Sequence, residues 1–413
     1  MLRSMFSAIS GLRGNQVYMD VIGNNIANIN TTAYKTARPT FAATLAQTVR
    51  PASAPETDRG GINPMQVGLG VSLASIDTIF TQGDLKSTGR LTDLAIEGDG
   101  FFILSDGQRQ VFTRDGAFDV GVDGTLLSAA TGFKVLGWMA DPTTGLVNTT
   151  ASPEPIVIPI GEGSPARATT ASNFNGNLDS RAAGGTTVVS NFEVYDSLGG
   201  THTLTLTFTK DAATPNTWTW AVTENDDAID GVTGSGTIIF DTSGRVSDGA
   251  TGTIAIDYTD ASGVADGSLD VDFSVVTQVA QSSEVTLSTR NGAGPGDFVT
   301  FTIDRAGVVT AVYSNGVNEV IGQIALANFA NPGGLTKSGN NFYEMSPNSG
   351  EPLISAPDSN GLGTINSRFL EAANVDLAQQ FTDMIIASRG FQANSRVVTV
   401  ADEMLQELVN LKR

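Results

Sequence analysis

Residues that could do chemistry are sparse in this chain of 413 residues. It contains no cysteine and one histidine, His202. Thiolate nucleophiles, disulfides and cysteine-based metal sites are therefore excluded, and a catalytic triad or imidazole metal site would depend on His202 alone. Because His202 follows a glycine pair at the start of a strand pattern, we expect a surface or strand-edge position for it. This composition disfavours most hydrolases and metalloenzymes, although carboxylate or lysine chemistry stays open.

Two glycine-rich motifs superficially resemble ligand loops. Residues 98–102 (GDGFF) lack the Lys-Ser/Thr of a phosphate-binding loop and no helix pattern follows them, so they predict a tight turn before a strand. Residues 119–124 (DVGVDG) miss the alternating oxygen ligands and closing glutamate of a calcium loop, which favours a β-turn. We therefore predict no catalytic, cofactor-binding or metal site, and no enzyme activity.

Both ends of the chain carry apolar residues at helical spacing. Spacings of three and four residues that persist over several heptads predict a coiled-coil-like seam. We call the first set the N-terminal stripe: Met5, Leu12, Met19 and Ile26. The second set is the C-terminal stripe: Leu377, Phe381, Met384, Phe391, Val398 and Leu405.

The remaining surface of both predicted helices is dominated by Asn, Gln, Ser, Ala and Gly, with few charges. A solvated helix normally carries many charged residues on its outer face. A narrow apolar seam with small uncharged flanks instead suits a helix surrounded by other helices. We therefore expect the stripes to pack between copies of the chain, with pairing inside one monomer as the alternative.

The middle of the chain has the texture of strands and turns. Residues 203–209 (TLTLTFT) alternate polar and apolar types, which predicts a half-buried strand, and Trp218 and Trp220 continue the pattern in a partner strand. The net charge of −20 is concentrated here: residues 145–285 hold 18 acidic and 4 basic residues, a balance of −14. Such a chain is a poor partner for nucleic acid or an anionic membrane.

These patterns predict a multidomain α+β fold in which long terminal helices form a coiled-coil-like domain and two mainly-β domains loop out between them. Prolines and glycines exclude one continuous regular element before the β region. The predicted divisions are a terminal helical domain (1–30 and 366–413), a linker or extended arm (31–70), a discontinuous first β domain (71–148 and 286–365) and an outer acidic β domain (149–285).

Residues 20–35 (DVIGNNIANINTTAYK) closely resemble the N-terminal signature of the bacterial flagellar rod and hook proteins. Ala33 replaces the glycine that is usual in that signature. Near the other end, residues 374–381 and 388–394 resemble the matching C-terminal signature, and residues 97–102, 112–116 and 325–329 resemble the first β domain of this family. The signature positions that match are Asn24, Asn25, Ile26, Asn28, Tyr34 and Lys35.

Within this family, the acidic insert and residues 195–199 (YDSLG) favour a hook subunit. Residues 46–71 resemble the linker of the distal rod subunit, which is therefore the alternative. The resemblance implies a structural protein without cofactors that polymerises helically, in many identical copies, into a short hollow flexible tube. This universal joint would transmit torque from the rod to the filament.

The resemblance also implies partners and a location. The partners would be the rod, the hook–filament junction proteins and, during assembly, the hook cap and the flagellar export apparatus. The tube would lie outside the cell, at the basal body and hook. Because residues 1–11 lack the apolar core and cleavage site of a secretory signal, we expect export without a cleaved signal peptide.

Overall fold

The computed structural model describes residues 2–52, 54, 60–141, 144–164, 166–224, 228–259 and 263–410. The chain divides into two compact units. Unit 1 comprises residues 1–158, 301–310 and 320–413, and unit 2 comprises residues 159–300 and 311–319. Among the described residues, no helix is both long enough and apolar enough to cross a bilayer.

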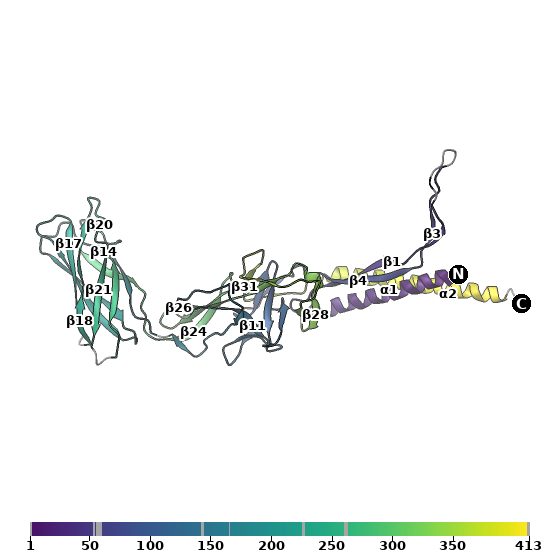
Figure 1. Cartoon of the computed structure of the whole chain (residues 1–413), viewed down its shortest axis with the longest axis horizontal. Coiled ribbons are helices and arrows are strands. Elements are labelled where there is room, and N and C mark those ends of the chain that lie inside the picture. Colours follow the sequence, from purple (N-terminus) through teal and green to yellow (C-terminus); the bar gives the residue numbers. More distant parts are fainter. Residues whose placement is uncertain are drawn as a thin grey trace. The chain divides into compact units, whose positions relative to one another are not determined.

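Unit 1 contains both long helices and a series of short strands (Figure 1). Its elements before unit 2 are α1 (Leu2–Ala27), β1 (Ala37–Ala43), β2 (Gln47–Arg50), β3 (Met65–Val67), β4 (Val71–Thr78), β5 (Leu85–Ser87), β6 (Leu94–Glu97), β7 (Phe101–Ser105), β8 (Gln110–Thr113), β9 (Phe118–Val120), β10 (Leu126–Ser128), β11 (Lys134–Met139) and β12 (Glu154–Pro155). Its later elements are β27 (Leu326–Asn328), the 3-10 helix η2 (Pro332–Gly334), β28 (Thr336–Gly339), β29 (Phe342–Glu344), β30 (Leu353–Ser355), β31 (Thr364–Ser367), β32 (Phe369–Glu371) and α2 (Leu377–Asn410).

Unit 2 is built from strands. Its elements are β13 (Gly163–Ser164), β14 (Ala171–Asn177), β15 (Thr187–Tyr195), β16 (Thr201–Lys210), β17 (Thr217–Glu224), β18 (Ile229–Thr233), β19 (Ser235–Phe240), β20 (Val246–Asp248), β21 (Thr251–Tyr258), β22 (Gly267–Asp272) and β23 (Glu284–Arg290). Three further strands contain residues of both units: β24 (Gly296–Ile303), β25 (Val308–Tyr313) and β26 (Asn318–Ile324).

The core of unit 2 lies between two five-stranded sheets, of strand orders β18-β21-β22-β14-β23 and β15-β16-β17-β19-β20. The alternation of residues 203–209 was interpreted correctly: Leu204, Leu206 and Phe208 are buried on β16. Trp218 and Trp220 are buried in the same core.

His202 corrects a prediction. It lies on β16, which is a central strand, and it is buried rather than on a surface or an edge. Its Nε2 lies 3.0 Å from Oδ2 of Asp196, and its ring tilts against Tyr258. The sequence pattern could not show this, because Asp196 is brought to His202 by the turn between β15 and β16.

The β region of unit 1 is a sheet in which β26, β11, β7, β8, β29 and β28 follow one another. Phe101, Phe112 and Trp138 are buried in its core. The motif at residues 98–102 is the predicted turn, because Gly98 and Gly100 have φ values of 108° and 130° and β7 begins directly afterwards. The motif at 119–124 is also a turn, with Gly124 at a φ of 74°.

The linker predicted at residues 31–70 contains paired strands, although residues 53 and 55–59 lie outside the described part. β1 pairs with β4, and β2 pairs with β3. Pro39 is accommodated inside β1, next to an irregularity of register between Thr40 and Phe41. Where the structure describes it, the linker is therefore an arm of two successive two-stranded ribbons.

The boundary predicted for the C-terminal helix was wrong. Residues 366–376 hold part of β31 and all of β32, and the helix begins only at Leu377. Oδ1 of Asp376 accepts hydrogen bonds from the backbone N–H groups of Ala378 and Gln379, which makes Asp376 the N-cap. The 34 residues of α2 span about 51 Å, at the rise of about 1.5 Å per residue.

Candidate assembly surface and junction of the chain ends

The helices α1 and α2 pack along one another in opposite directions (Figure 1). Asn25 Nδ2 donates to Gln380 Oε1 at 3.0 Å near one end of the pair. Further along, a Cβ added to Gly390 would lie 3.0 Å from Asn15 Nδ2, and one added to Gly11 would lie 2.6 Å from Asn394 Nδ2. Small and polar residues therefore let the two backbones approach closely.

Burial along the pair follows helical spacing. The fully buried residues are Ala8, Ile22 and Asn25 of α1 and Gln380, Ala387 and Ala401 of α2. In a helix, residues three, four and seven apart share one face. The pair is thus centred mainly on small and amide side chains, and the large apolar residues other than Ile22 lie beside this line or away from it.

The residues of the two stripes differ in how far they are buried. Met5, Leu12, Met19 and Ile26 are all half-buried, and so are Met384, Val398 and Leu405 of the C-terminal stripe. Leu377, Phe381 and Phe391 stay exposed. The chain therefore partly covers the whole N-terminal stripe but only half of the C-terminal stripe, and packing of the stripes between copies stays a prediction.

Part of the uncovered apolar surface of the two helices lies outside both stripes. The exposed large apolar residues outside both stripes are Phe6, Ile385, Ile386, Val397, Val400, Met404 and Val409. Ile385 and Val409 were expected beside the C-terminal stripe, whereas the other residues of this set were missed. Val397, Val400 and Met404 repeat at spacings of three and four, which is a signal of a second face. The stronger seven-residue repeat obscured this signal.

The N-terminal signature forms a hydrogen-bonded stop at the end of α1. Asn24 donates to the hydroxyl of Tyr34, and this hydroxyl donates to Asn25 Oδ1 at 3.1 Å. Asn25 Nδ2 also donates to the carbonyl of Ala37. Asn28 donates back to the carbonyl and side-chain oxygens of Asn24, at 2.9 and 3.0 Å. Asn28 thereby binds one backbone carbonyl in the last turn of α1, and the contacts of Asn24 and Asn25 with Tyr34 and Ala37 fix the direction in which the chain leaves the helix.

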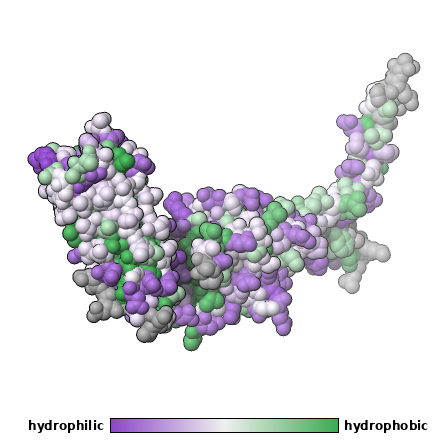
Figure 2. All heavy atoms as spheres, turned by 60° about the vertical axis from the view of Figure 1, so that its left-hand side comes forward, coloured by the Kyte–Doolittle hydropathy of each residue, from purple (hydrophilic) through white to green (hydrophobic). Residues whose placement is uncertain are grey.

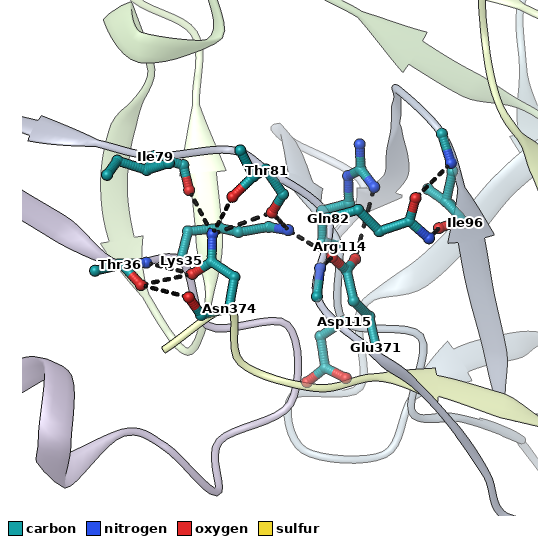
Figure 3. Close-up of polar contacts among 12 residues, drawn as sticks. Lys35, Thr36, Ile79, Thr81, Gln82, Ile96, Arg114, Asp115, Glu371 and Asn374 are labelled. Atoms are coloured by element: carbon teal, nitrogen blue, oxygen red, sulfur yellow. Dashed lines mark hydrogen bonds and ion pairs between the residues drawn. The ribbon is translucent and has the colours of Figure 1, made fainter. Parts of the chain in front are cut away.

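Lys35 at the end of the signature joins the two ends of the chain (Figure 3). Its ammonium group lies 2.5 Å from Glu371 Oε1, and both side chains have 0% exposure. It also donates to the carbonyl of Thr81 at 2.8 Å. Glu371 Oε1 accepts a second hydrogen bond from the backbone N–H of Gly83 at 2.8 Å. We call Lys35, Arg114 and Glu371, with the backbone groups that they bind, the junction.

Asn374 extends the junction along the C-terminal segment (Figure 3). Its Oδ1 accepts from the backbone N–H and the hydroxyl of Thr36, at 2.8 and 2.7 Å. Its Nδ2 donates to the carbonyls of Ile79 and Thr81, at 2.9 and 3.1 Å. One side chain thereby connects three separate segments, which fits its place in the C-terminal signature.

Arg114 completes the charges of the junction. Its Nη1 lies 3.6 Å from Glu371 Oε2, and the side chain is 3% exposed. Its guanidinium also lies 5.5 Å from the centroid of the Phe101 ring. Burial lowers the pKa of Lys35, an effect that the carboxylate of Glu371 opposes. Burial has the opposite effect on an acid, and it raises the pKa of the neighbouring Asp115 carboxyl.

The charged side chains of the junction are buried, and Lys35 donates a hydrogen bond to Glu371. In the part of the chain that the structure describes, no three His, Cys, Asp or Glu side chains cluster in a way that could hold a metal ion. The junction instead fixes where the two helices emerge from the β region.

Four family models match the chain. They are "Flagella basal body rod protein" at residues 5–35, "Flagellar hook protein FlgE/F/G D1 domain" at 95–173, "Flagellar basal body protein FlaE D2 domain" at 165–293 and "Flagellar basal body rod FlgEFG protein C-terminal" at 366–411. The matches therefore cover both ends and much of the β region.

Similar proteins were found over the full length. The flagellar hook protein FlgE of Borreliella burgdorferi is 42% identical and that of Treponema pallidum 40% identical, each over 100% of both chains. The flagellar basal-body rod protein FlgG of Bacillus subtilis is 31% identical over 100% of both chains. The crystal structure of Helicobacter pylori flagellar hook protein FlgE2 shares the fold, with a TM-score of 0.54 and 15% identity over 70% of this chain and 100% of that one. The chain belongs to the flagellar hook protein family.

Proposed function

We propose that this chain is the repeating structural subunit of a bacterial flagellar hook, without enzymatic activity. Many copies polymerise helically into a short hollow tube outside the cell, and this tube bends while it transmits torque from the rod to the filament. The tube joins the rod at one end and the junction proteins of the filament at the other. Membership of the hook protein family supports this proposal.

The apolar surface of the helix pair is the observation that carries the proposal. Phe6, Ile385 and Ile386 are 64%, 61% and 59% exposed. A groove of about 520 Å³ between α1 and β4, lined by residues that include Ile9 and Val17, extends this surface. Exposed apolar surface on this scale marks an interaction site. Helices of neighbouring copies, packed side by side around the tube, would cover it.

The distribution of charge supports the same arrangement. α1 contains only Arg3, Arg13 and Asp20 as charged residues. In a helical polymer each uncompensated charge recurs in every copy, and burying unpaired charges is costly. A helix with as few charges as α1 therefore suits the interior of the tube, whereas the acidic residues 145–285 suit its solvated outside.

Unit 2 offers polar surface for contacts that have to change as the tube bends. Thr219 and Thr223 lie exposed on β17, and Thr205 and Thr207 lie half-buried on the neighbouring β16. Hydroxyl groups can exchange hydrogen-bond partners and water at little cost. We propose that contacts between the outer units of stacked copies are of this polar kind and slide during rotation.

The proposal is tested by placing a charge on the exposed helix surface. Ile385→Asp should abolish tubes seen by electron microscopy, while the folded monomer changes little because Ile385 is exposed. Ile385→Val is the control and should assemble normally. Normal tubes from Ile385→Asp would contradict burial of this surface between copies.

A distal rod subunit is the second candidate. Its support is the full-length similarity to the rod protein FlgG of Bacillus subtilis, together with the arm formed by β1–β4 and β2–β3. The two candidates differ in the shape of the polymer. A tube that curves supports the hook, and a straight stiff tube supports the rod.

A further inference from the structure

In the part of the chain that the structure describes, no layer covers the distal ribbon of the arm, β2–β3. All its strand residues are exposed, and β2 and β3 form a two-stranded sheet of their own. The exposed apolar residues in and beside it are Leu45, Val49, Met65, Val67 and Leu69. Figure 2 shows hydrophobic residues at the surface of this arm.

The proximal ribbon, β1–β4, differs because it rests on α1. The ring of Phe41 lies edge-on to Tyr18 with centroids 6.2 Å apart, and Ser10 Oγ accepts a hydrogen bond from the N–H of Val71 at 3.2 Å. An isolated two-stranded ribbon is at best marginally stable in water, and packing against a helix is one way to stabilise it. Among the described residues no helix packs on the distal ribbon, so packing against a helix of another copy would stabilise it.

The last turns of α2 present a surface of matching chemistry. Val397, Val400 and Met404 are 44%, 50% and 45% exposed, and their spacing places them on one face. Residues 397–410 carry three acidic residues, Asp402, Glu403 and Glu407, and no basic one. Acidic groups near a helix C-terminus are disfavoured by the helix dipole, so a cation from a partner would stabilise them.

The ribbon supplies such a cation. Arg50 is exposed on β2, and it is the only charged residue among residues 43–52 and 60–70. The described part of the ribbon therefore combines exposed apolar residues with one positive charge, whereas residues 397–410 combine exposed apolar residues with three negative charges. Glu56, Asp58 and Arg59, between the two strands of the ribbon, and Lys412 and Arg413 lie outside the described residues.

We propose that the ribbon β2–β3 of one copy packs on the face of α2 formed by Val397, Val400 and Met404 in a second copy, with Arg50 beside Glu403 and Glu407. Both surfaces are exposed in the same chain, so the chain does not bring its own ribbon onto its own α2. The inference rests on the proposed function, since it requires many copies side by side. The ribbon and α2 thereby form one of the contacts between copies in the polymer.

The absence of cysteine allows a clean test. Val49→Cys and Val400→Cys are made in separate full-length chains, the two chains are mixed and assembled, and the tubes are treated with a short bis-maleimide. We expect a covalent dimer that contains one chain of each kind. A mixture of Val49→Cys with Val122→Cys, whose residue is exposed between β9 and β10, should give none.

Other outcomes overturn the proposal in distinguishable ways. Normal tubes without the mixed dimer, or with dimers from Val49→Cys chains alone, would contradict this contact and leave the hook function intact. A chain carrying both cysteines that cross-links only within itself would show that the ribbon binds its own α2. Failure of the unmodified chain to form any tube would instead contradict the proposed function.

A charge exchange tests the polar part of the contact. Arg50→Glu should reduce the yield of the mixed dimer by about tenfold, because like charges would then face each other. Glu403→Arg with Glu407→Arg in the second chain should restore it. An unchanged yield with Arg50→Glu would show that Arg50 takes no part in the contact.

Discussion

Lys35 and Glu371 form a fully buried ion pair between the two ends of the chain, with 2.5 Å between Nζ and Oε1. Lys35 follows α1 and Glu371 precedes α2, so the pair forms only when both ends reach the β region together. This geometry ties the N-terminal signature to the C-terminal segment. It also fixes where the chain leaves the end of α1 and where it enters α2.

Removing one partner of this pair should destabilise unit 1. In Lys35→Met the carboxylate of Glu371 would remain buried without its ammonium partner, and we expect a loss of about 3–5 kcal/mol in unfolding free energy. Hydrogen exchange of β6 and β8 in increasing urea measures it. The control is Lys134→Met, since Lys134 pairs with Asp123 at the surface and should contribute below about 1 kcal/mol. Equal effects of the two substitutions would contradict a special role for the buried pair.

Ala33 holds a backbone conformation that disfavours alanine. Its φ is 55°, and its N–H donates to the carbonyl of Glu371 at 2.8 Å. Because glycine adopts left-handed conformations without steric cost, Ala33→Gly should stabilise unit 1 by about 1 kcal/mol. Thermal unfolding measures this. Ala393→Gly, in the interior of α2, should instead destabilise by about 1 kcal/mol, so a loss of stability in both variants would refute the strain at Ala33.

Alanine substitutions at Gly83 and at Gly23 should change the stability of the protein in opposite directions. A Cβ at Gly83 would lie 2.1 Å from the carbonyl oxygen of Ala372, so Gly83→Ala must displace the backbone that carries Glu371. A Cβ at Gly23 meets nothing within 4 Å, and Gly23→Ala should stabilise α1 by about 1 kcal/mol. Urea unfolding, monitored by circular dichroism, measures the unfolding free energy of both variants. Tolerance of alanine at Gly83 would show that the two segments are not this close.

Asp115 should make stability depend on pH. Burial raises its pKa above the ordinary value of 3.8, so the folded state holds this proton more tightly than the unfolded state. The resulting stabilisation is complete below pH 3.8 and is lost as pH rises through the folded pKa. Asp115→Asn removes this loss.

The unfolding free energy of Asp115→Asn relative to the natural chain should therefore increase from pH 3.8 upward and then level off. Asp119→Asn, at an exposed position on β9, is the control. Parallel pH profiles for the natural chain and Asp115→Asn would contradict the raised pKa.

Local patterns predicted the regular parts of this fold well. The alternation of polar and apolar residues at 203–209 predicted β16 and its buried face, because successive side chains of a strand point to opposite faces of the sheet. The glycine turns at residues 98–102 and 119–124 were also predicted, since positive φ values are a local property. Both terminal helices follow from their apolar spacing.

Long-range pairing could not be read from spacing. The start of α2 was placed too early because Glu371 and Asn374 are held in the junction by Lys35 and Thr36, more than 300 residues away. Burial of His202 depends on a turn that returns Asp196 to it. The seven-residue stripes were visible, but the close approach at Gly11 and Gly390 turns small and amide residues toward the partner helix instead.

The most direct test of the central claim is a reconstruction of the assembled polymer by electron cryomicroscopy at side-chain resolution. We predict a hollow tube in which Phe381, Ile385 and Ile386 of each copy are covered by the helices of neighbouring copies. A tube whose terminal helices leave these three side chains in contact with solvent would contradict the account.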